Sequence, residues 1–313
     1  MLTRRLGATG LTVSRLAIGT MAWGTRTSAE DAADLLTAFR AAGGTLVDTA
    51  HGYAGGASEE ILGDLLHGSR DEVVLVTKSG ISRASGSRVV DCSRRAMLAQ
   101  LDTSLRRMRT DHVDVWLAHT WDEHTPLEET VGALVHAHTS GRARYVGVSN
   151  HVGWQAARTM SLLAEAKVPL AVDSVEYSLV ARAPERELVD AAAHLGFGLM
   201  PWSPLGRGVL AGRYRTTVAA DSRLASEEFS RFAGRHVGDH TRGVVEAVHT
   251  AATGLGVSPA VVALAWVRDR PGVVAPIIGP RTPTQLSALL ESEDVELPDE
   301  IVLALDEVSV EHA

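Results

Sequence analysis

The sequence predicts an α/β protein that folds as a single (β/α)8 barrel. Eight short runs rich in β-branched residues alternate with longer stretches whose apolar residues recur at helical spacing, which is the pattern of βαβ units around a parallel sheet. Eight strands close such a barrel, whereas an open doubly wound sheet usually has fewer and carries a nucleotide-binding glycine loop near its start. The chain has 313 residues, of which 45% are hydrophobic, so one domain over residues 1–313 can bury a large core.

The expected strands consist mainly of Val, Ile, Leu and Ala. In chain order they occupy residues 15–20, 45–49, 72–78, 114–119, 143–149, 170–176, 197–202 and 273–279. The first helical pattern, residues 28–43, has clear end signals: Ser28 suits the N-cap, Asp31 adds a carboxylate to the first turn, and Gly43 suits the C-terminal stop.

A long irregular stretch follows the seventh expected strand, from about Ser203 to His240. Pro201, Pro204 and several glycines interrupt any helix there, and the segment is rich in arginine, with Arg207, Arg213, Arg215, Arg223, Arg231 and Arg235. It is too long for an ordinary connection in a compact domain, so we expect a functional loop that can receive an anionic ligand. From charge alone, a solvated surface loop is the simpler interpretation.

Composition excludes several classes of function. Thirty Lys and Arg oppose 38 Asp and Glu, for a net charge of −8, which argues against a nucleic-acid partner. The single cysteine, Cys92, excludes an internal disulfide and a multi-thiolate metal site, and favours a reducing compartment such as the cytoplasm. We find no apolar stretch of the length of a signal peptide or membrane span, and no pattern that decides between a monomer and a homo-oligomer.

Four titratable side chains stand at or just after expected strands. Asp48 ends the second strand and Tyr53 lies in the following loop, while Lys78 ends the third strand and His119 the fourth. Because the strands share one carboxyl-end face, the four can converge there. An ammonium group paired with a carboxylate lowers the pKa of a neighbouring phenol, which would suit proton transfer near neutral pH. Taken singly, each residue also has an ordinary structural explanation, such as a cap or a surface salt bridge.

Motifs along nearly the whole chain resemble the aldo-keto reductase superfamily, especially its bacterial and potassium-channel-β-subunit-like branches. The opening RRLGATGLTVSRLAIGTMAWG is similar to the family's N-terminal hairpin and first strand, and VDTAHGYAGGASEEILGDLL to its signature. The motifs VTKSG, DVWLAHT, YVGVSN, VEYSL, PWSPLGRGVLAG and PIIGPRTPTQL follow in the family's order. The resemblance implies a catalytic tetrad of Asp48, Tyr53, Lys78 and His119.

The implied reaction is hydride transfer from NADPH to the carbonyl of a small-molecule substrate, with Tyr53 as proton donor. His119 would orient the substrate oxygen, Lys78 would tune Tyr53, and Asp48 would hold Lys78. We expect substrate contacts from Trp23, Tyr53, His119 and Trp121. Their aromatic rings suit an apolar or ring-bearing carbonyl, ordinary packing of large residues is the alternative, and the identity of the carbonyl stays open.

The resemblance further implies a dinucleotide site. Ser149, Asn150 and Ser174 would face the nicotinamide carboxamide, Trp202 would stack on the ring, and Arg281 would favour NADPH over NADH through the 2′-phosphate. The full expected set is Gly19, Thr20, Met21, Asp48, Ser149, Asn150, Ser174, Trp202, Ser203, Pro204, Leu205, Gly206, Arg207, Gly279, Arg281 and Gln285. Two positions depart from the family: Ser174 replaces a glutamine that bonds the carboxamide, and Leu289 replaces an asparagine that contacts adenine.

Three alternatives remain. A metal-dependent barrel hydrolase is suggested by the 13 histidines, but His136 and His138 lie in a helical pattern and point in different directions, so we expect no metal site. A Rossmann dehydrogenase is disfavoured because GRGVLAG comes late and lacks a flanking strand and helix. A non-catalytic NADP(H)-binding regulatory subunit, like the channel β subunits, would keep the same fold and tetrad.

Overall fold

The computed structural model describes residues 1–82, 87–212 and 239–310 of the chain. The predicted irregular stretch therefore lies largely outside the described residues, together with Arg213, Arg215, Arg223, Arg231 and Arg235. Arg207 is among the described residues and is buried.

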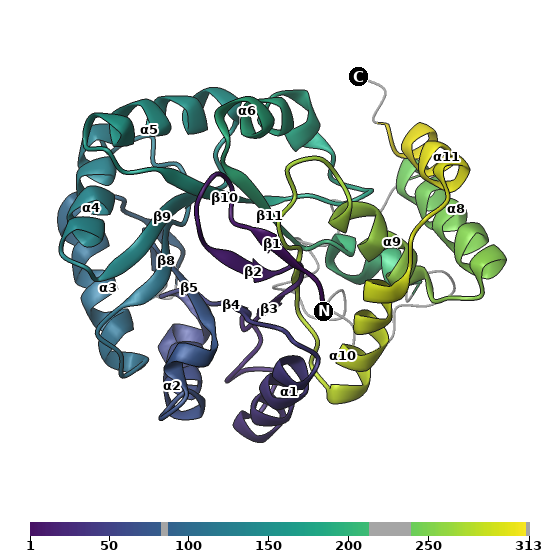
Figure 1. Ribbon diagram of the computed structural model, residues 1–313, viewed down its shortest axis with the longest axis horizontal. Coiled ribbons are helices and arrows are strands. Elements are labelled where there is room, and N and C mark those ends of the chain that lie inside the picture. The colour runs from purple at the N-terminus through teal and green to yellow at the C-terminus, as the bar shows by residue number, and fades with distance from the viewer. Residues whose placement is uncertain (83–86, 213–238, 311–313) are drawn as a thin grey trace.

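Eight parallel strands form a closed barrel, which confirms the predicted fold class (Figure 1). The strands are β3 (Ala17–Gly19), β4 (Leu46–Asp48), β5 (Val74–Ser79), β8 (Val113–Ala118), β9 (Ala143–Ser149), β10 (Leu170–Glu176), β11 (Gly198–Trp202) and β12 (Ile277–Ile278). The barrel closes where β12 pairs with β3, with Ile277 opposite Ala17 and Ile278 opposite Ile18. All eight strands overlap predicted ones, although several begin or end at other residues.

Helices surround the barrel and connect its strands (Figure 1). They are α1 (Ala29–Ala41), α2 (Ala57–Leu65), α3 (Arg94–Arg107), α4 (Leu127–Thr139), α5 (Gly153–Glu165), α6 (Leu188–Leu195), α8 (Asp239–Leu255), α9 (Pro259–Arg268), α10 (Pro283–Leu290) and α11 (Asp299–Ser309). Short 3-10 turns add η1 (Tyr53–Gly56), η2 (Arg70–Glu72), η3 (Ala183–Arg186), η4 (Gly206–Ala211) and η7 (Glu291–Asp294). Ser28 caps α1 by accepting from the Asp31 N–H, and Gly43 has a φ of 82°, as predicted.

A hairpin of β1 (Thr3–Arg5) and β2 (Thr12–Ser14) closes the amino end of the barrel, as the resemblance implied. Its Leu6 and Val13 are fully buried and join the apolar cluster inside the barrel. Gly7 sits at the closest approach: with φ at +58°, a Cβ there would lie 2.7 Å from the carbonyl oxygen of Ala171. A second hairpin, β6 (Ile81–Ser82) with β7 (Val89–Val90), follows β5 and was not predicted.

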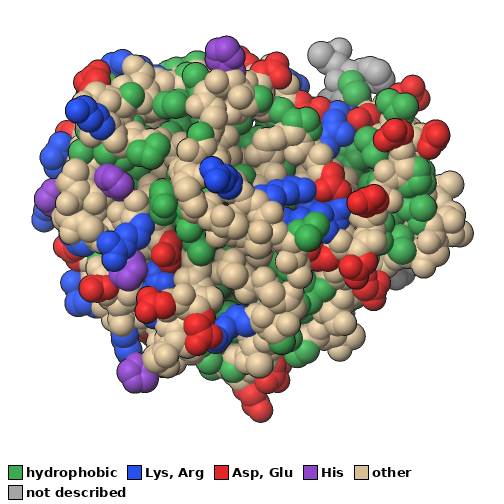
Figure 2. Space-filling view, in the orientation of Figure 1, with side chains coloured by type: hydrophobic (Ala, Val, Ile, Leu, Met, Phe, Trp, Pro, Cys, Tyr) green, Lys and Arg blue, Asp and Glu red, His purple; other side chains and the backbone are tan. Residues whose placement is uncertain are grey.

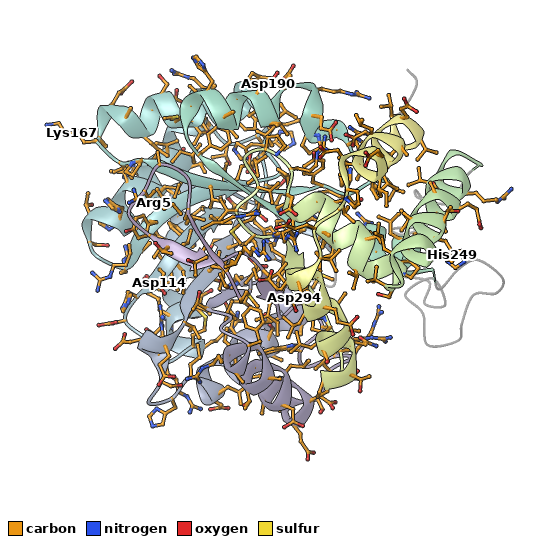
Figure 3. All side chains as sticks on the ribbon, turned by 45° about the vertical axis from the view of Figure 1, so that its right-hand side comes forward. Arg5, Asp114, Lys167, Asp190, His249 and Asp294 are labelled. Atoms are coloured by element: carbon orange, nitrogen blue, oxygen red, sulfur yellow. The ribbon has the colours of Figure 1, made fainter. Side chains whose placement is uncertain are left out.

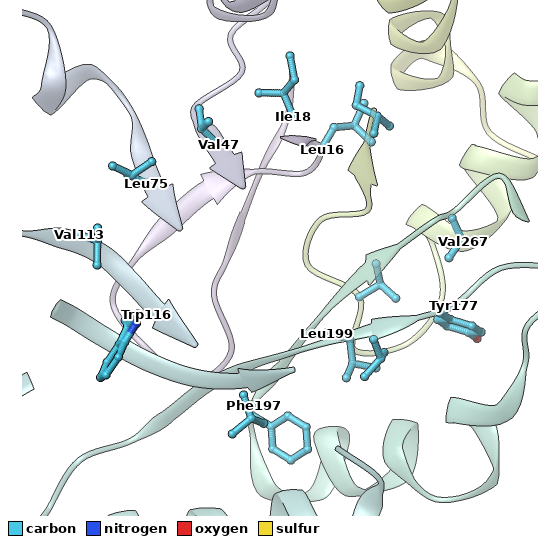
Figure 4. Close-up of a cluster of buried hydrophobic side chains, with 14 of the residues drawn as sticks. Leu16, Ile18, Val47, Leu75, Val113, Trp116, Tyr177, Phe197, Leu199 and Val267 are labelled. Atoms are coloured by element: carbon cyan, nitrogen blue, oxygen red, sulfur yellow. The ribbon is translucent and has the colours of Figure 1, made fainter. Parts of the chain in front are cut away.

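The core has two layers because side chains alternate along each strand. Inside the barrel lie small and medium-sized apolar residues such as Ala17, Val115 and Met200. Between the sheet and the helices lies a larger layer that includes Trp116 and Phe197 (Figure 4). The rigid barrel that results holds the strand ends in fixed positions.

Charged side chains lie mainly at the surface. Lys167 and Asp190 stand at the periphery in Figure 3, and Figure 2 shows acidic and basic groups interspersed over one face. In the described part of the chain, no single helix is long and apolar enough to cross a membrane. Only the pair Thr241–Leu255 and Pro259–Arg268 passes that test by length and composition, and the pair is bent by 101°.

Candidate active site

The carboxyl ends of neighbouring strands bring the four predicted catalytic side chains together. Asp48 is the last residue of β4, Lys78 lies near the end of β5, His119 follows β8, and Tyr53 opens η1. The Lys78 Nζ lies 2.5 Å from Asp48 Oδ1 and 5.3 Å from the centre of the Tyr53 ring. The Tyr53 and His119 rings meet edge to face, with centroids 5.9 Å apart.

The Lys78–Asp48 ion pair is almost completely buried. Only 2% and 3% of the two side chains is exposed, and Lys78 Nζ also donates to the Thr49 carbonyl oxygen at 3.0 Å. Burial lowers the pKa of Lys78, but Asp48 and Tyr53 outweigh it and hold the pKa above its usual value. Lys78 is therefore a fixed positive charge beside the Tyr53 phenol.

The pKa of Tyr53 differs in direction from the prediction. Burial raises it, and the charge and hydrogen bond of Lys78 counteract only part of that increase. The sequence argument weighed the charge of Lys78 but not the removal of the phenol from water. At neutral pH, Tyr53 is thus a protonated phenol next to an ammonium group, which is the form that donates a proton.

His119 is a neutral imidazole. Burial, followed by the charges of Lys78 and Arg88, lowers its pKa well below the usual value. Both backbone polar groups of His119 are hydrogen-bonded. The N–H donates to the Ser79 carbonyl oxygen at 2.7 Å, and the carbonyl oxygen accepts from Asn150 Nδ2 at 2.9 Å. Among the described residues its buried Nδ1 has no hydrogen-bond partner.

The ends of β9, β10 and β11 carry a connected polar group beside His119. Ser149 Oγ donates to the Ser174 carbonyl oxygen at 2.7 Å, and Trp202 Nε1 donates to Asn150 Oδ1 at 3.0 Å. Asn150 adopts the left-handed conformation with φ at 61°. The structure therefore brings four of the predicted cofactor residues together. Among the described residues, the buried Ser174 hydroxyl has no partner.

The segment after β11 turns sharply. Ser203, Gly206, Arg207 and Gly208 all have positive φ, and Pro204 is buried between them. Successive left-handed residues of this kind can form concave sites for anions. The arginine side chain does not simply point to solvent, because Arg207 donates to Glu176 Oε1 from Nε at 3.0 Å and from Nη2 at 2.7 Å.

Glu176 is a site residue that sequence reasoning missed. It ends β10, and its partner Arg207 lies with its guanidinium carbon 5.6 Å from the centre of the Trp202 ring. A carboxylate at the end of a strand, in VDSVE, was the available signal. The guanidinium of Arg207 supports the Trp202 ring from one side. Its positive charge is already paired with the Glu176 carboxylate. A contact between Arg207 and a phosphate stays a prediction.

The remaining predicted cofactor residues fall into two groups. Gly19 is the last residue of β3 and Thr20 follows it. A Cβ on Gly19 would lie 2.7 Å from Ile277 Cγ2, and Met21 is 39% exposed. At the start of α10, Gln285 Oε1 accepts from the Arg281 N–H at 2.9 Å.

Two further positions lie near that second group. Gly279 follows β12, and Leu289 is buried with 8% exposure on α10. The roles of Gly279 and Arg281 in binding stay predictions.

Of the predicted substrate contacts, Trp121 is the more accessible tryptophan. Its ring packs edge to face against Trp154, with centroids 5.2 Å apart, and Trp154 is 58% exposed. Trp23 is completely buried in the outer core layer, so its role as a substrate contact stays a prediction.

Two observations bear on the metal alternative. His136 and His138 do lie on a helix, α4. No group of three or more His, Cys, Asp or Glu side chains that could hold a metal ion occurs among the residues that the structure describes.

A closed parallel barrel with titratable side chains at the carboxyl ends of its strands has the architecture of the (β/α)8-barrel enzymes. Comparison with known sequences defines the family within that class. Residues 15–310 match the Aldo/keto reductase family. The chain belongs to this family of oxidoreductases.

Several relatives match most of the chain. It is 35% identical over 303 residues to a probable voltage-gated potassium channel subunit beta of Oryza sativa subsp. japonica, which covers 93% of this chain and 91% of the relative. It is 33% identical over 251 residues to an L-glyceraldehyde 3-phosphate reductase of Escherichia coli (77% and 72%). It is 30% identical over 316 residues to an aryl-alcohol dehydrogenase [NADP(+)] of Phanerodontia chrysosporium (93% and 81%).

Proposed function

We propose that the protein is an NADPH-dependent reductase of aldehyde or ketone carbonyls, with Tyr53 as the proton donor. The observation that carries this proposal is the buried Lys78–Asp48 pair at 2.5 Å, beside the half-buried Tyr53 phenol and a neutral histidine. The names of the relatives that reduce an aldehyde phosphate or use NADP(+) support the same chemistry.

The residues would divide the work as follows. The Tyr53 hydroxyl gives its proton to the carbonyl oxygen as the carbonyl carbon gains a hydride, so that an alcohol is formed. The Lys78 ammonium then stabilises the phenolate that Tyr53 becomes, and Asp48 holds that ammonium in place. His119 donates one hydrogen bond to the substrate oxygen, which a neutral imidazole can do from a single nitrogen.

The residues present fit a nicotinamide dinucleotide. Ser174 has a buried hydroxyl without a partner among the described residues, at the end of the barrel where a carboxamide would be held with Ser149 and Asn150. A bound reduced nicotinamide supplies the hydride. Trp202 would hold the ring, and Arg281 with Gln285 would receive the adenosine end, where a guanidinium favours the 2′-phosphate of NADPH.

We propose a ring-bearing or apolar carbonyl as substrate, because Trp121 follows His119 by two residues and packs against the exposed Trp154. Two large aromatic rings packed together close to His119 in the sequence favour flat apolar groups. Cys92 is a buried free thiol, and we place the protein in the reducing cytoplasm on that basis.

The first test of the proposal is cofactor binding. NADPH and NADH are titrated into the protein while tryptophan fluorescence is followed. We expect quenching at lower concentrations of NADPH, and the quenching should diminish in Trp202→Phe. Equal affinities for the two cofactors would contradict the role of Arg281.

The second test is turnover on a panel of aldehydes and ketones. Tyr53→Phe removes only the phenolic hydroxyl, and we expect kcat to fall about 100-fold or more while NADPH still binds. Unchanged turnover would refute the role of Tyr53.

A regulatory NADP(H)-binding subunit is the second candidate, favoured by the 35% identity to the rice protein named as a probable channel β subunit. Tight NADPH binding with no turnover on the whole panel would support it over the reductase.

A further inference from the structure

The turn that carries Tyr53 has an unusual backbone. After Tyr53, Ala54, Gly55 and Gly56 have φ values of 50°, 65° and 109°, so three successive residues are left-handed. Glycine adopts this conformation readily, but alanine does not. Such a turn persists only where the surrounding structure holds it.

The guanidinium of Arg107, at the end of α3, lies against this turn. Its Nη1 donates to the His51 carbonyl oxygen at 3.0 Å, and its Nη2 donates to the Gly55 carbonyl oxygen at 3.4 Å. The missing side chain of Gly56 makes room for it, since a Cβ there would lie 2.3 Å from the guanidinium carbon. One planar group thus bonds the chain on both sides of Tyr53.

Arg107 is itself held by a buried carboxylate. Glu59, on α2, is completely buried, and its Oε2 accepts from Arg107 Nη1 at 3.0 Å. Its other oxygen, Oε1, accepts from the Thr77 hydroxyl at 2.8 Å. Thr77 immediately precedes Lys78 on β5, so the same carboxylate connects the Tyr53 turn to the strand that carries the ammonium group.

The turn also has a direct bond to that strand. The His51 N–H donates to the Lys78 carbonyl oxygen at 3.0 Å. Burial and the charge of Arg107 lower the pKa of His51 to about 4, so its ring is neutral at physiological pH where its Nδ1 lies 3.3 Å from Arg107 Nη1. A second positive charge next to the guanidinium is avoided.

We propose that Arg107 and Glu59 are positioning residues that hold the phenol of Tyr53 against Lys78 and His119. This inference rests on the proposed reductase function, because it concerns the proton donor of that reaction. Within the part of the chain that the structure describes, neither side chain forms a hydrogen bond with the Tyr53 hydroxyl; both act through the backbone on either side of it. When the bonds that Arg107 forms with the Tyr53 turn are removed, we expect proton transfer from Tyr53 to be slower and cofactor binding to be retained.

The test compares three substitutions in the full chain. Arg107→Met removes the charge and the fork of donors, and Arg107→Lys keeps the charge only. Gly56→Ala displaces the guanidinium and also strains the left-handed turn itself, so it tests the geometry of the turn and not Arg107 alone. Arg106→Met is the matched control, because Arg106 is an exposed neighbour on α3 that bonds Thr103 of its own helix.

With saturating NADPH, we expect Arg107→Met and Gly56→Ala to lower kcat at least tenfold, with a larger solvent isotope effect. Arg107→Lys should lie between them and the wild type. The NADPH dissociation constant should change less than about twofold, and Arg106→Met should match the wild type throughout. A folded Arg107→Met protein with unchanged kcat would overturn the inference, as would equal losses of turnover and NADPH affinity.

A second measurement does not depend on activity. Hydrogen exchange of amides 51–57 should accelerate in Arg107→Met and in the milder Arg107→Lys, while that of β9 stays unchanged. Unchanged hydrogen exchange of the amides of residues 51–57 would overturn the positioning role of Arg107, even if the wild type reduced no carbonyl. If the wild type reduced no carbonyl while hydrogen exchange at residues 51–57 changed as expected, the proposed function would be contradicted and the positioning role of Arg107 would stand.

Discussion

Removing Lys78 should expose how much the buried ion pair contributes to stability, separately from its role in the reaction. Lys78→Met deletes the ammonium group and leaves the Asp48 side chain, which is 3% exposed in the wild type, without its charged partner. With Nζ and Oδ1 2.5 Å apart, the gross attraction is about 7 kcal/mol at an effective dielectric constant of about 20. Taking both ions out of water costs several kcal/mol each, so the intact pair is close to neutral for stability.

The single substitution removes the attraction and leaves the desolvation cost of Asp48. We therefore expect Lys78→Met to lower the free energy of unfolding by about 3–5 kcal/mol. That is a large part of the roughly 5–15 kcal/mol that stabilises a typical protein domain. Urea unfolding, followed by circular dichroism and tryptophan fluorescence, measures the loss.

The double variant Lys78→Met/Asp48→Val provides the control. It removes both charges, so it should be more stable than Lys78→Met by at least about 2 kcal/mol, while reductase turnover stays lost in both. If the single variant lost less than about 1 kcal/mol, or the double variant were no more stable than the single one, the two charges would not be coupled in the way described.

Three further predictions concern stability. Burial lowers the pKa of His151 from 6.5 to about 4, so its contribution is present above pH 6.5 and is lost on acidification. His151→Asn should therefore lose less stability between pH 7 and pH 4 than the wild type, by on the order of 3 kcal/mol in urea unfolding; parallel pH profiles would contradict this. Gly7→Ala should cost about 1–3 kcal/mol, because its Cβ would meet the Ala171 carbonyl oxygen at 2.7 Å with φ at +58°; an unchanged melting temperature would show that the hairpin adapts. Ser28→Ala should cost about 1 kcal/mol through loss of the α1 cap, whereas Ser28→Asp should keep the cap; equal losses in both would argue against capping.

The barrel could be predicted from the sequence because each strand and each helix has its own local pattern of apolar residues, and the alternation of the two patterns repeats along the chain. The strands at residues 143–149 and 170–176 match the structure residue for residue. The last expected strand, 273–279, is reduced to Ile277–Ile278. Pro276 explains part of the difference, since it has no N–H to donate and only its carbonyl oxygen bonds the neighbouring strand, at Ala17.

The site could be predicted from the sequence only in part. Strand ends and family motifs indicated Asp48, Lys78 and His119, because parallel strands place their ends at one face. The direction of the Tyr53 pKa was wrong, since the degree of burial depends on chain segments far from it in sequence. Arg107 lies at a helix end with no local signal, 56 residues from His51, so only the folded chain shows that the two meet.

Pairing of the first barrel strand with the last has a consequence for synthesis on the ribosome. β3 finds its second neighbour only when Ile277 has emerged, and Arg15 pairs with Glu293 still later, with Nε and Oε1 3.0 Å apart. The edge of β3 that faces β12 therefore stays unpaired until Ile277 and Ile278 have been synthesised, and an unpaired strand edge can associate with other chains. Contacts of such long sequence separation slow folding, so closure of the barrel at β3 and β12 is expected to be a late step.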